Sequence, residues 1–270
     1  MHNFQYMPPD LYFALTLIVK MAVTAGFVLA ATVTAERAGP LVGGLVATLP
    51  IGAGPVYVFL SLDHDAHFIA QSAVASLAIN AVNVAFATVY VLLAQKRSLS
   101  VSLATGMAAW TALALAVHAM QWTVFTALAM NAVVLALCLW LVRPLRHVTM
   151  PPVHRRWFDL PMRALLVALL VGVVVGLSFR LGATISGILA VFPVVLISIM
   201  LILHNRVGGK PTAAVLANAP LGLIGFAFAC AVLHFSAERL GIAPALALAL
   251  ATSIGWSLAV LTARRHGIAV

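Results

Sequence analysis

The residues that could do chemistry include one short run rich in acidic and histidine side chains. Asp63-His64-Asp65-Ala66-His67 places two imidazoles three positions apart, with a carboxylate four positions before the second. Imidazole and carboxylate groups are ligands of zinc and copper, and histidine also titrates near neutral pH. The spacing matches no recognised metal signature, and a solvated loop explains it as simply. Asp63, His64 and His67 therefore stay weak metal candidates, and we expect no resident cofactor.

Polar side chains inside otherwise apolar segments form a second candidate set. Asn80 and Asn83 lie three positions apart, on one face of a predicted helix, and could line a solute pathway. Asn131 is more simply explained as a contact between helices, while Asn218 stands just before a proline. Lys20 is a basic residue well inside an apolar run, where it could reach outward to the interface, bind an anion or couple transport to protons.

Helix-breaking residues mark the third candidate set. The run Pro50-Ile51-Gly52-Ala53-Gly54-Pro55 falls in the middle of one predicted span, and Pro193 falls at the matching place of another. Proline removes a backbone donor and frees a carbonyl, and freed groups at membrane depth are tolerated where they are buried in protein or face a wet cavity. The pattern predicts two discontinuous helices that meet near the midplane and bind a substrate; simple kinks for packing are the alternative.

Several signatures of enzymes are missing. The sequence contains no Walker motif, Gly-x-Ser-x-Gly, His-Glu-x-x-His or Cys-x-x-Cys. No acidic residue falls deep in an apolar run, whereas cation pumps usually exchange a proton on a buried carboxylate. ATP hydrolysis and intramembrane proteolysis are therefore disfavoured, and we expect the protein not to be an enzyme. Cys138 and Cys230 lie in apolar runs and are interpreted as small core residues.

The composition argues against a soluble globule. Of the 270 residues, 64% are hydrophobic and only 8% are charged, whereas a soluble domain carries roughly 25% charged residues. Unbroken apolar runs of about 20 residues have the length of a membrane-spanning helix, and they lack the alternation of a transmembrane β-barrel. The net charge of +9 is typical of basic inner loops, and we expect no nucleic-acid partner.

Hydropathy predicts an all-α, polytopic membrane bundle of nine transmembrane helices, at residues 11–35, 40–61, 68–94, 99–117, 121–142, 162–179, 183–204, 212–235 and 242–263. With the loops assigned alternately to two sides, twelve Lys and Arg residues fall on one side and two, Arg180 and Arg239, on the other. Basic loops stay in the cytoplasm. The asymmetry therefore predicts a multi-pass protein of a bacterial-type inner (plasma) membrane, with its N-terminus outside and its C-terminus in the cytoplasm.

The sequence also contains an internal repeat. Residues 37–50 align with residues 180–193 at an offset of 143, with Arg, Gly, Gly, Ala and Pro recurring in order. Lys20 matches Arg163, and Trp110 matches Trp256 at nearly the same offset. Five spans separate the copies, and because five is odd the second copy enters from the opposite side. The prediction is a 4+1+4 inverted repeat: a first unit at 1–120, a connector helix and basic linker at 121–161, and a second unit at 162–270.

The repeat unit resembles a known family. Gly182 to Gly208, with the core Ile185-Ser186-Gly187-Ile188-Leu189-Ala190-Val191-Phe192-Pro193, is followed by an Ala-rich helix, Ala243 to Ala263, that contains Trp256. This pattern is similar to the small four-helix GlpM-type inner-membrane proteins, over about 100 residues of the second half and more faintly over residues 12–115. The resemblance implies a four-helix unit and no defined substrate, so the chain looks like two such units fused in opposite orientations.

Three functions remain open. Inverted repeats are the plan of many secondary transporters, which favours a transporter or exporter of a small neutral, anionic or amphiphilic solute that works by alternating access. The residues expected at its site are Pro50, Gly52, Gly54, Pro55, Asn80, Asn83, Pro193, Lys20 and Asn218. The alternatives are a lipid-handling or assembly factor and a membrane enzyme or metal-binding protein that uses the Asp/His run. Membrane lipid and a small solute are the expected partners, and self-association into a homo-oligomer stays open.

Overall fold

A computed structural model describes residues 9–37, 52–145 and 157–266. Helices make up the regular structure of this part of the chain, and no strand occurs in it. The helices are α1 (Pro9–Arg37), α3 (Ala53–Asp63), α4 (Ala66–Leu93), α5 (Leu99–His118), α6 (Val124–Val142), the 3-10 turn η1 (Arg143–Leu145), α7 (Asp159–Ala190), α8 (Val194–Val207), α9 (Gly209–Leu216), α10 (Ala219–Leu240) and α11 (Ile242–Arg265). The predicted all-α class is thus confirmed.

Seven helical stretches within these ranges are long and apolar enough to cross a membrane. They are Leu11–Ala30, Ala66–Leu93, Leu99–His118, Val124–Leu145, Asp159–Val207, Gly209–Leu240 and Ile242–Ala263. Most of the predicted second span, including Pro50, lies outside the described residues, and α3 supplies its last part. The chain is therefore a helical protein with the apolar segments of a multi-pass membrane protein.

The stretch of 49 residues from Asp159 to Val207 folds back on itself. Gly182 has φ 72° and ψ 175°, a left-handed backbone that glycine adopts without steric cost, and the chain reverses direction there. The two ends of the stretch meet again, because Arg206 Nη1 donates to Asp159 Oδ2 at 2.6 Å. The stretch is thus a helical hairpin, which is why the sequence separates 162–179 from 183–204.

The second arm of this hairpin is itself interrupted. Its first half, the half-helix 183–190, ends at Ala190, and α8 begins at Val194. Between them Pro193 has no backbone N–H to continue the ladder and disfavours a helical residue before it. The discontinuity expected at Pro193 is therefore present.

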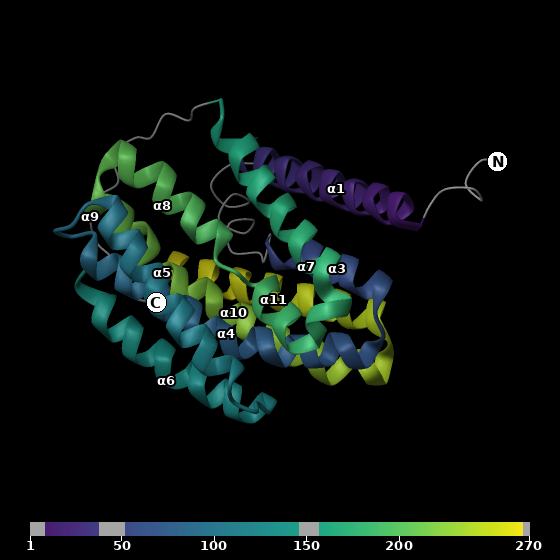
Figure 1. The fold of residues 1–270 in the computed structure, drawn as a ribbon. Coiled ribbons are helices and arrows are strands. Elements are labelled where there is room, and N and C mark those ends of the chain that lie inside the picture. The colour runs from purple at the N-terminus through teal and green to yellow at the C-terminus, as the bar shows by residue number, and fades with distance from the viewer. Residues whose placement is uncertain (1–8, 38–51, 146–156, 267–270) are drawn as a thin grey trace.

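The middle of the bundle is α4, most of whose residues are buried. It packs against α7, α10, α6 and α5, and Figure 1 shows α1 and α6 on opposite edges with α4 between them. Alanine and serine dominate its first half, and small side chains let neighbouring helices approach closely in a membrane. The first half of α4 therefore allows close packing of the helices around it.

The half-helix 183–190 lies against α4 in backbone contact. A Cβ built on Gly187 would lie 2.2 Å from the backbone oxygen of Ser72 and 2.9 Å from Ala75 Cβ. Both contacts are shorter than van der Waals separation, and a backbone oxygen in the middle of a packed helix cannot move aside cheaply. Glycine is therefore required at position 187.

We predict that Gly187→Ala destabilises the protein by about 1–3 kcal/mol, the usual cost of overpacking. Gly255→Ala is the matched control, because it is also a helical glycine but nothing lies within 4 Å of its added Cβ; it should be neutral or slightly stabilising. Thermal unfolding of both variants in detergent measures the difference. Equal stability of the two variants would contradict the close approach.

Candidate functional site

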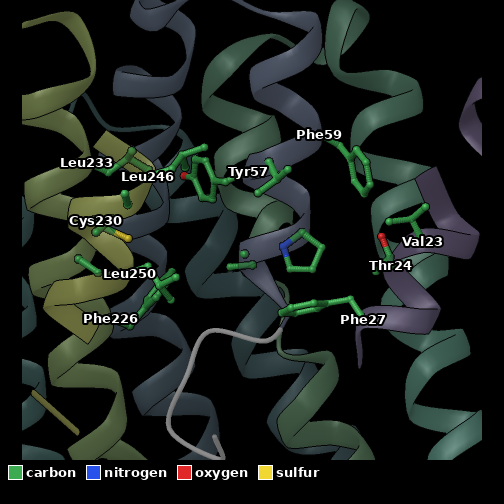
Figure 2. Close-up of a pocket in the computed structure, with 17 residues that line it drawn as sticks. Val23, Thr24, Phe27, Tyr57, Phe59, Phe226, Cys230, Leu233, Leu246 and Leu250 are labelled. Carbon is green, nitrogen blue, oxygen red and sulfur yellow. The ribbon is translucent and has the colours of Figure 1, made fainter. Parts of the chain in front are cut away.

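The described residues line an open apolar cavity of about 430 Å³, within the size range of small-molecule sites. Figure 2 shows side chains of α1 and α3 facing those of α10 and α11 across it. Its lining includes Val23, Thr24 and Phe27 from α1, Gly54, Pro55 and Tyr57 from α3, Phe226 and Cys230 from α10, and Leu246 and Leu250 from α11. The cavity thus lies between segments of the two predicted repeat units.

The few polar groups in the cavity wall are already engaged. Thr24 Oγ1 donates to the carbonyl of Lys20 at 2.8 Å. The hydroxyls of Tyr57 and Ser76 are 2.7 Å apart, and Ser76 donates its own proton to the Gly187 carbonyl at 2.6 Å. Tyr57 is therefore the donor to Ser76. The wall offers a guest an apolar surface and few free hydrogen-bonding groups.

The cavity opens toward the outer face of the bundle. Several of its lining side chains are about half exposed: Val23 at 56%, Phe27 at 53%, and Val58 and Leu250 at 48% each. The same face of α1 exposes further large apolar residues, among them Ile18 and Val19. Large exposed apolar faces on spanning helices are the surfaces that meet lipid. In a membrane, the mouth of the cavity would therefore face hydrocarbon.

An ion pair borders the cavity. Lys20 Nζ lies 2.5 Å from Asp63 Oδ2, with the two side chains 10% and 23% exposed. The ammonium is also 6.0 Å from the ring of Phe59, which lines the cavity. Asp63 ends α3 at its turn into α4, so the pair joins Lys20 of α1 to that turn. The pairing was missed from the sequence because the partners are 43 positions apart.

The acidic and histidine-rich run ties this turn to three other helices. His64 Nε2 lies 2.7 Å from Ser178 Oγ of α7, and His67 Nδ1 lies 2.7 Å from Glu238 Oε1 of α10. Asp65 accepts from the backbone of Phe68 at 2.9 Å and so caps α4. Asp63 is paired with Lys20 of α1, so each His and Asp of the run has a different partner. The described residues contain no group of three or more His, Cys, Asp or Glu that could hold a metal.

Burial lowers the pKa of His64, and the neighbouring carboxylates of Asp63 and Asp65 only partly oppose this, while Lys20 adds to it. Ser178 donates its own proton to the Val175 carbonyl at 2.9 Å. The proton shared with His64 therefore belongs to the imidazole Nε2. The lowered pKa favours the neutral imidazole of His64, which stacks on Phe68 with ring centroids 3.7 Å apart.

Asn80 and Asn83 are buried in α4 and away from the cavity lining. Asn80 Nδ2 donates to Asn131 Oδ1 at 2.8 Å and to the Leu223 carbonyl at 3.0 Å. Asn83 donates to the Val191 carbonyl and accepts from Trp110 Nε1, both at 2.8 Å. Asn80 Oδ1 finds no donor among the described residues. The two amides therefore hold helices together, and Asn131 does so as expected, with a further bond to the Leu77 carbonyl at 2.7 Å.

Of the remaining residues predicted at the site, some line the cavity and others lie elsewhere. Gly54 and Pro55 line the cavity. Gly52 lies where α3 begins, and a Cβ on it would be 3.6 Å from Val195 of α8; the start of α3 therefore lies beside the start of α8, just after Pro193. Asn218 precedes α10 and donates to the Ala214 carbonyl at 2.9 Å. Pro50 lies outside the described residues.

Sequence reasoning overlooked the serines of α4 and most of the cavity. Ser72, Ser76, Asn80 and Asn83 are spaced by four, four and three positions, the period of one helix face, so this polar stripe was readable. The cavity lining, by contrast, consists of ordinary apolar residues from four separate helices, and periodicity carries no signal for it. Cys230 is buried and free, as is Cys138.

We predict that Lys20→Met destabilises the protein by about 3 kcal/mol, since it leaves the Asp63 carboxylate without its partner in a largely desolvated place. Lys20→Met combined with Asp63→Asn should recover most of this loss, because no unpaired charge then remains. Thermal unfolding in detergent, measured for the two single variants and the double variant, gives the coupling. Additive effects of the single changes would rule out the ion pair.

A lowered His64 pKa makes stability depend on pH. Below the ordinary histidine pKa of about 6.5, the unfolded chain takes up a proton that folded His64 resists, so stability falls as the pH falls. Other histidines also titrate, and His64→Gln therefore serves as the reference. We expect wild-type thermal stability to drop more steeply than that of His64→Gln between about pH 7.5 and about pH 5. Parallel curves would contradict the assignment.

No family model, curated protein or solved structure matches this chain. The likeness to GlpM-type proteins is left as a resemblance of sequence pattern. What the protein does must therefore be inferred from the geometry of its own residues.

Proposed function

We propose that this protein is a secondary transporter or exporter of a small amphiphilic solute, built from two inverted four-helix units. The coarser statement is secure: apolar helices long enough to span a membrane make up most of the described chain. Two units in opposite orientation have two nearly equivalent arrangements, and exchange between them opens a shared site to each side in turn.

The observation that carries the proposal is the place where α4 and α10 cross. Asn80 of α4 bonds to Leu223 of α10, and these residues are 143 positions apart, the offset of the sequence repeat. Nearer their other ends, His234 Nδ1 lies 2.9 Å from the Ala70 carbonyl, so the two helices run antiparallel. Equivalent residues of two units touch one another only where a two-fold axis passes between them. The crossing therefore supports an inverted repeat.

The pair α1 and α7 repeats this relation. Close contacts join Leu17 to Gly176 and Met21 to Gly172, so numbers rise in one helix as they fall in the other. One further turn in the same register brings Ala25 opposite Ala168, again 143 positions apart. Two pairs of helices therefore meet at residues 143 positions apart, which is expected if one two-fold axis relates the two units.

The two tryptophans offer a third parallel. Trp110 of α5 donates to Asn83 of α4, and Trp256 of α11 donates to the Leu221 carbonyl of α10 at 2.8 Å. In each proposed unit the indole of the last helix thus bonds to the helix before it. The basic-loop asymmetry of the sequence supports nine spans with the N-terminus outside, and we retain that topology as part of the proposal.

The cavity fits this function by its place and its chemistry. It lies between α1 and α3 of the first proposed unit and α10 and α11 of the second, where relative movement of the units would reshape it. Its apolar wall disfavours small hydrophilic ions, which narrows the expected neutral, anionic or amphiphilic solutes to amphiphilic ones.

A lipid-handling factor that moves nothing is the second candidate, and the mouth of the cavity toward hydrocarbon favours it. The two functions differ in whether occupancy leads to transfer across the bilayer. The third alternative, an enzyme or metal protein, loses its support from the Asp/His run, whose side chains are bound to α1, α7 and α10 or cap α4.

A reversible lock tests transport. His67 and Glu238 are 69% and 53% exposed at their side chains, so Cys at both positions can be bridged by a short, reducible, water-soluble bis-thiosulfonate, whereas the native cysteines are buried. We expect proteoliposomes loaded with a small-molecule and lipid extract to release a subset of compounds, to stop when the bridge forms, and to resume after reduction. Each single-cysteine variant is the control.

Release that the bridge leaves unchanged would overturn transport by rocking of the two units. Absence of any protein-dependent release, together with binding of an amphiphile, would favour the lipid-handling factor instead.

A further inference from the structure

We propose that the cavity binds the alkyl chain of a single-chain membrane amphiphile whose zwitterionic head group sits between Lys20 and Asp63. The statement that this molecule is transported rests on the function proposed above, whereas its binding does not. Three features of the molecule select this ligand class: an apolar cavity, a mouth toward lipid, and an ion pair near one end.

The ligand must be largely apolar, because the cavity wall is apolar and its mouth opens toward lipid. The polar atoms of the wall, on Thr24 and Tyr57, are engaged within the protein, so a polar guest would lose its hydration without replacement bonds. Access past Val23, Phe27 and Val58 runs through side chains that face hydrocarbon. An alkyl chain already in the bilayer can enter by that route without crossing water.

The ion pair lies at the end of the cavity that belongs to the α3–α4 turn. Thr24 and Phe59 line the cavity. Lys20 lies one helical turn before Thr24, and its ammonium lies near the ring of Phe59. Asp63, His64 and His67 gather at the same end of the bundle, whereas Gly54 and Pro55 line the cavity near the start of α3, away from that turn. The site is therefore polar at one end and apolar along its length, which is the pattern of a lipid standing in one leaflet.

A zwitterionic head group matches this pair better than a single charge does. Where the dielectric constant is low, an anion bound to Lys20 would leave the Asp63 carboxylate without a partner. A cation bound to Asp63 would likewise leave the Lys20 ammonium unpaired. A head group carrying an anion and a cation can bond to both at once, so that every charge keeps a partner. Lys20 and Asp63 can then exchange each other for the two charges of the head group without any proton transfer and without adding net charge to the site.

Photolabelling tests the site. The probe is a lysophosphatidylethanolamine with a diazirine on its alkyl chain, incorporated into vesicles with the full-length protein. We expect labelled peptides from α1, α3, α10 or α11 and at least a tenfold loss of labelling in Val58→Trp, which fills the cavity from its half-exposed edge. Val133→Trp on α6 is the matched control, because Val133 is 68% exposed and lines no part of the cavity.

The head-group preference is tested with the double variant Lys20→Met/Asp63→Asn, which carries no unpaired charge. The same alkyl chain is presented with a zwitterionic, a phosphate-only or an uncharged glycerol head. Wild-type protein should label about tenfold more with the zwitterionic probe than with either other probe, and the double variant should lose this preference while it still labels with the uncharged one. Retention of the preference in the double variant would overturn the assignment of the head group.

Binding and transport can fail separately. Labelling that is insensitive to Val58→Trp, or that falls outside the four helices, overturns the site even if the bridged variant shows lock-sensitive release of other compounds. Labelling at the cavity with no lock-sensitive movement of a fluorescent lysolipid between leaflets upholds the site and overturns transport. Equal labelling by all three probes overturns the head-group assignment and leaves a chain site alone.

Discussion

The hydrogen bonds from α4 to the half-helix 183–190 are the constraint on which the rest of the structure depends. A helix interrupted at membrane depth leaves carbonyls without partners, and each costs several kcal/mol in hydrocarbon. Ser72 donates to the Ala183 carbonyl at 3.0 Å, Ser76 to Gly187 and Asn83 to Val191, so one face of α4 serves the half-helix at regular intervals. The interruption at Pro193 is stable because this face is polar.

This arrangement also explains why α4 has its composition. Its serines and asparagines must reach backbone atoms rather than long side chains, and that requires the helices to be in close contact, as at Gly187. Bulkier residues on this face would separate the two segments and leave the carbonyls bare. Packing and hydrogen bonding are therefore satisfied by the same small side chains, and neither can be changed alone.

The cavity is linked to this core by a short relay. Tyr57 forms part of the cavity wall and donates to Ser76, which in turn donates to the half-helix. The cavity wall and the half-helix 183–190 are thus connected through the side chain of Ser76. The link consists of two hydrogen bonds and needs no long pathway through the protein.

Much of the fold could be predicted from the sequence, because long apolar runs, Gly182 and Pro193 act locally. The reversal between 162–179 and 183–204 and the break at Pro193 were readable for this reason. The site was less accessible. Gly54 and Pro55 line the cavity. Pro193, Asn80 and Asn83 lie buried away from it, and their place on a substrate pathway stays a prediction. The partner of Lys20 and the lining from α10 and α11 depend on which helices meet, and periodicity within one helix does not contain that information.

The depth of the ion pair has a consequence for the membrane in which the protein works. Within the described part of the chain, α1 packs mainly on α7, and Lys20 on Asp63 is its polar attachment to the turn beside the cavity mouth. The strength of that attachment varies with the local dielectric, which changes over a few ångströms between head groups and hydrocarbon. Bilayer thickness sets where the pair falls in this gradient. In a membrane, the attachment of α1 beside the cavity would therefore depend on the thickness of the bilayer around it.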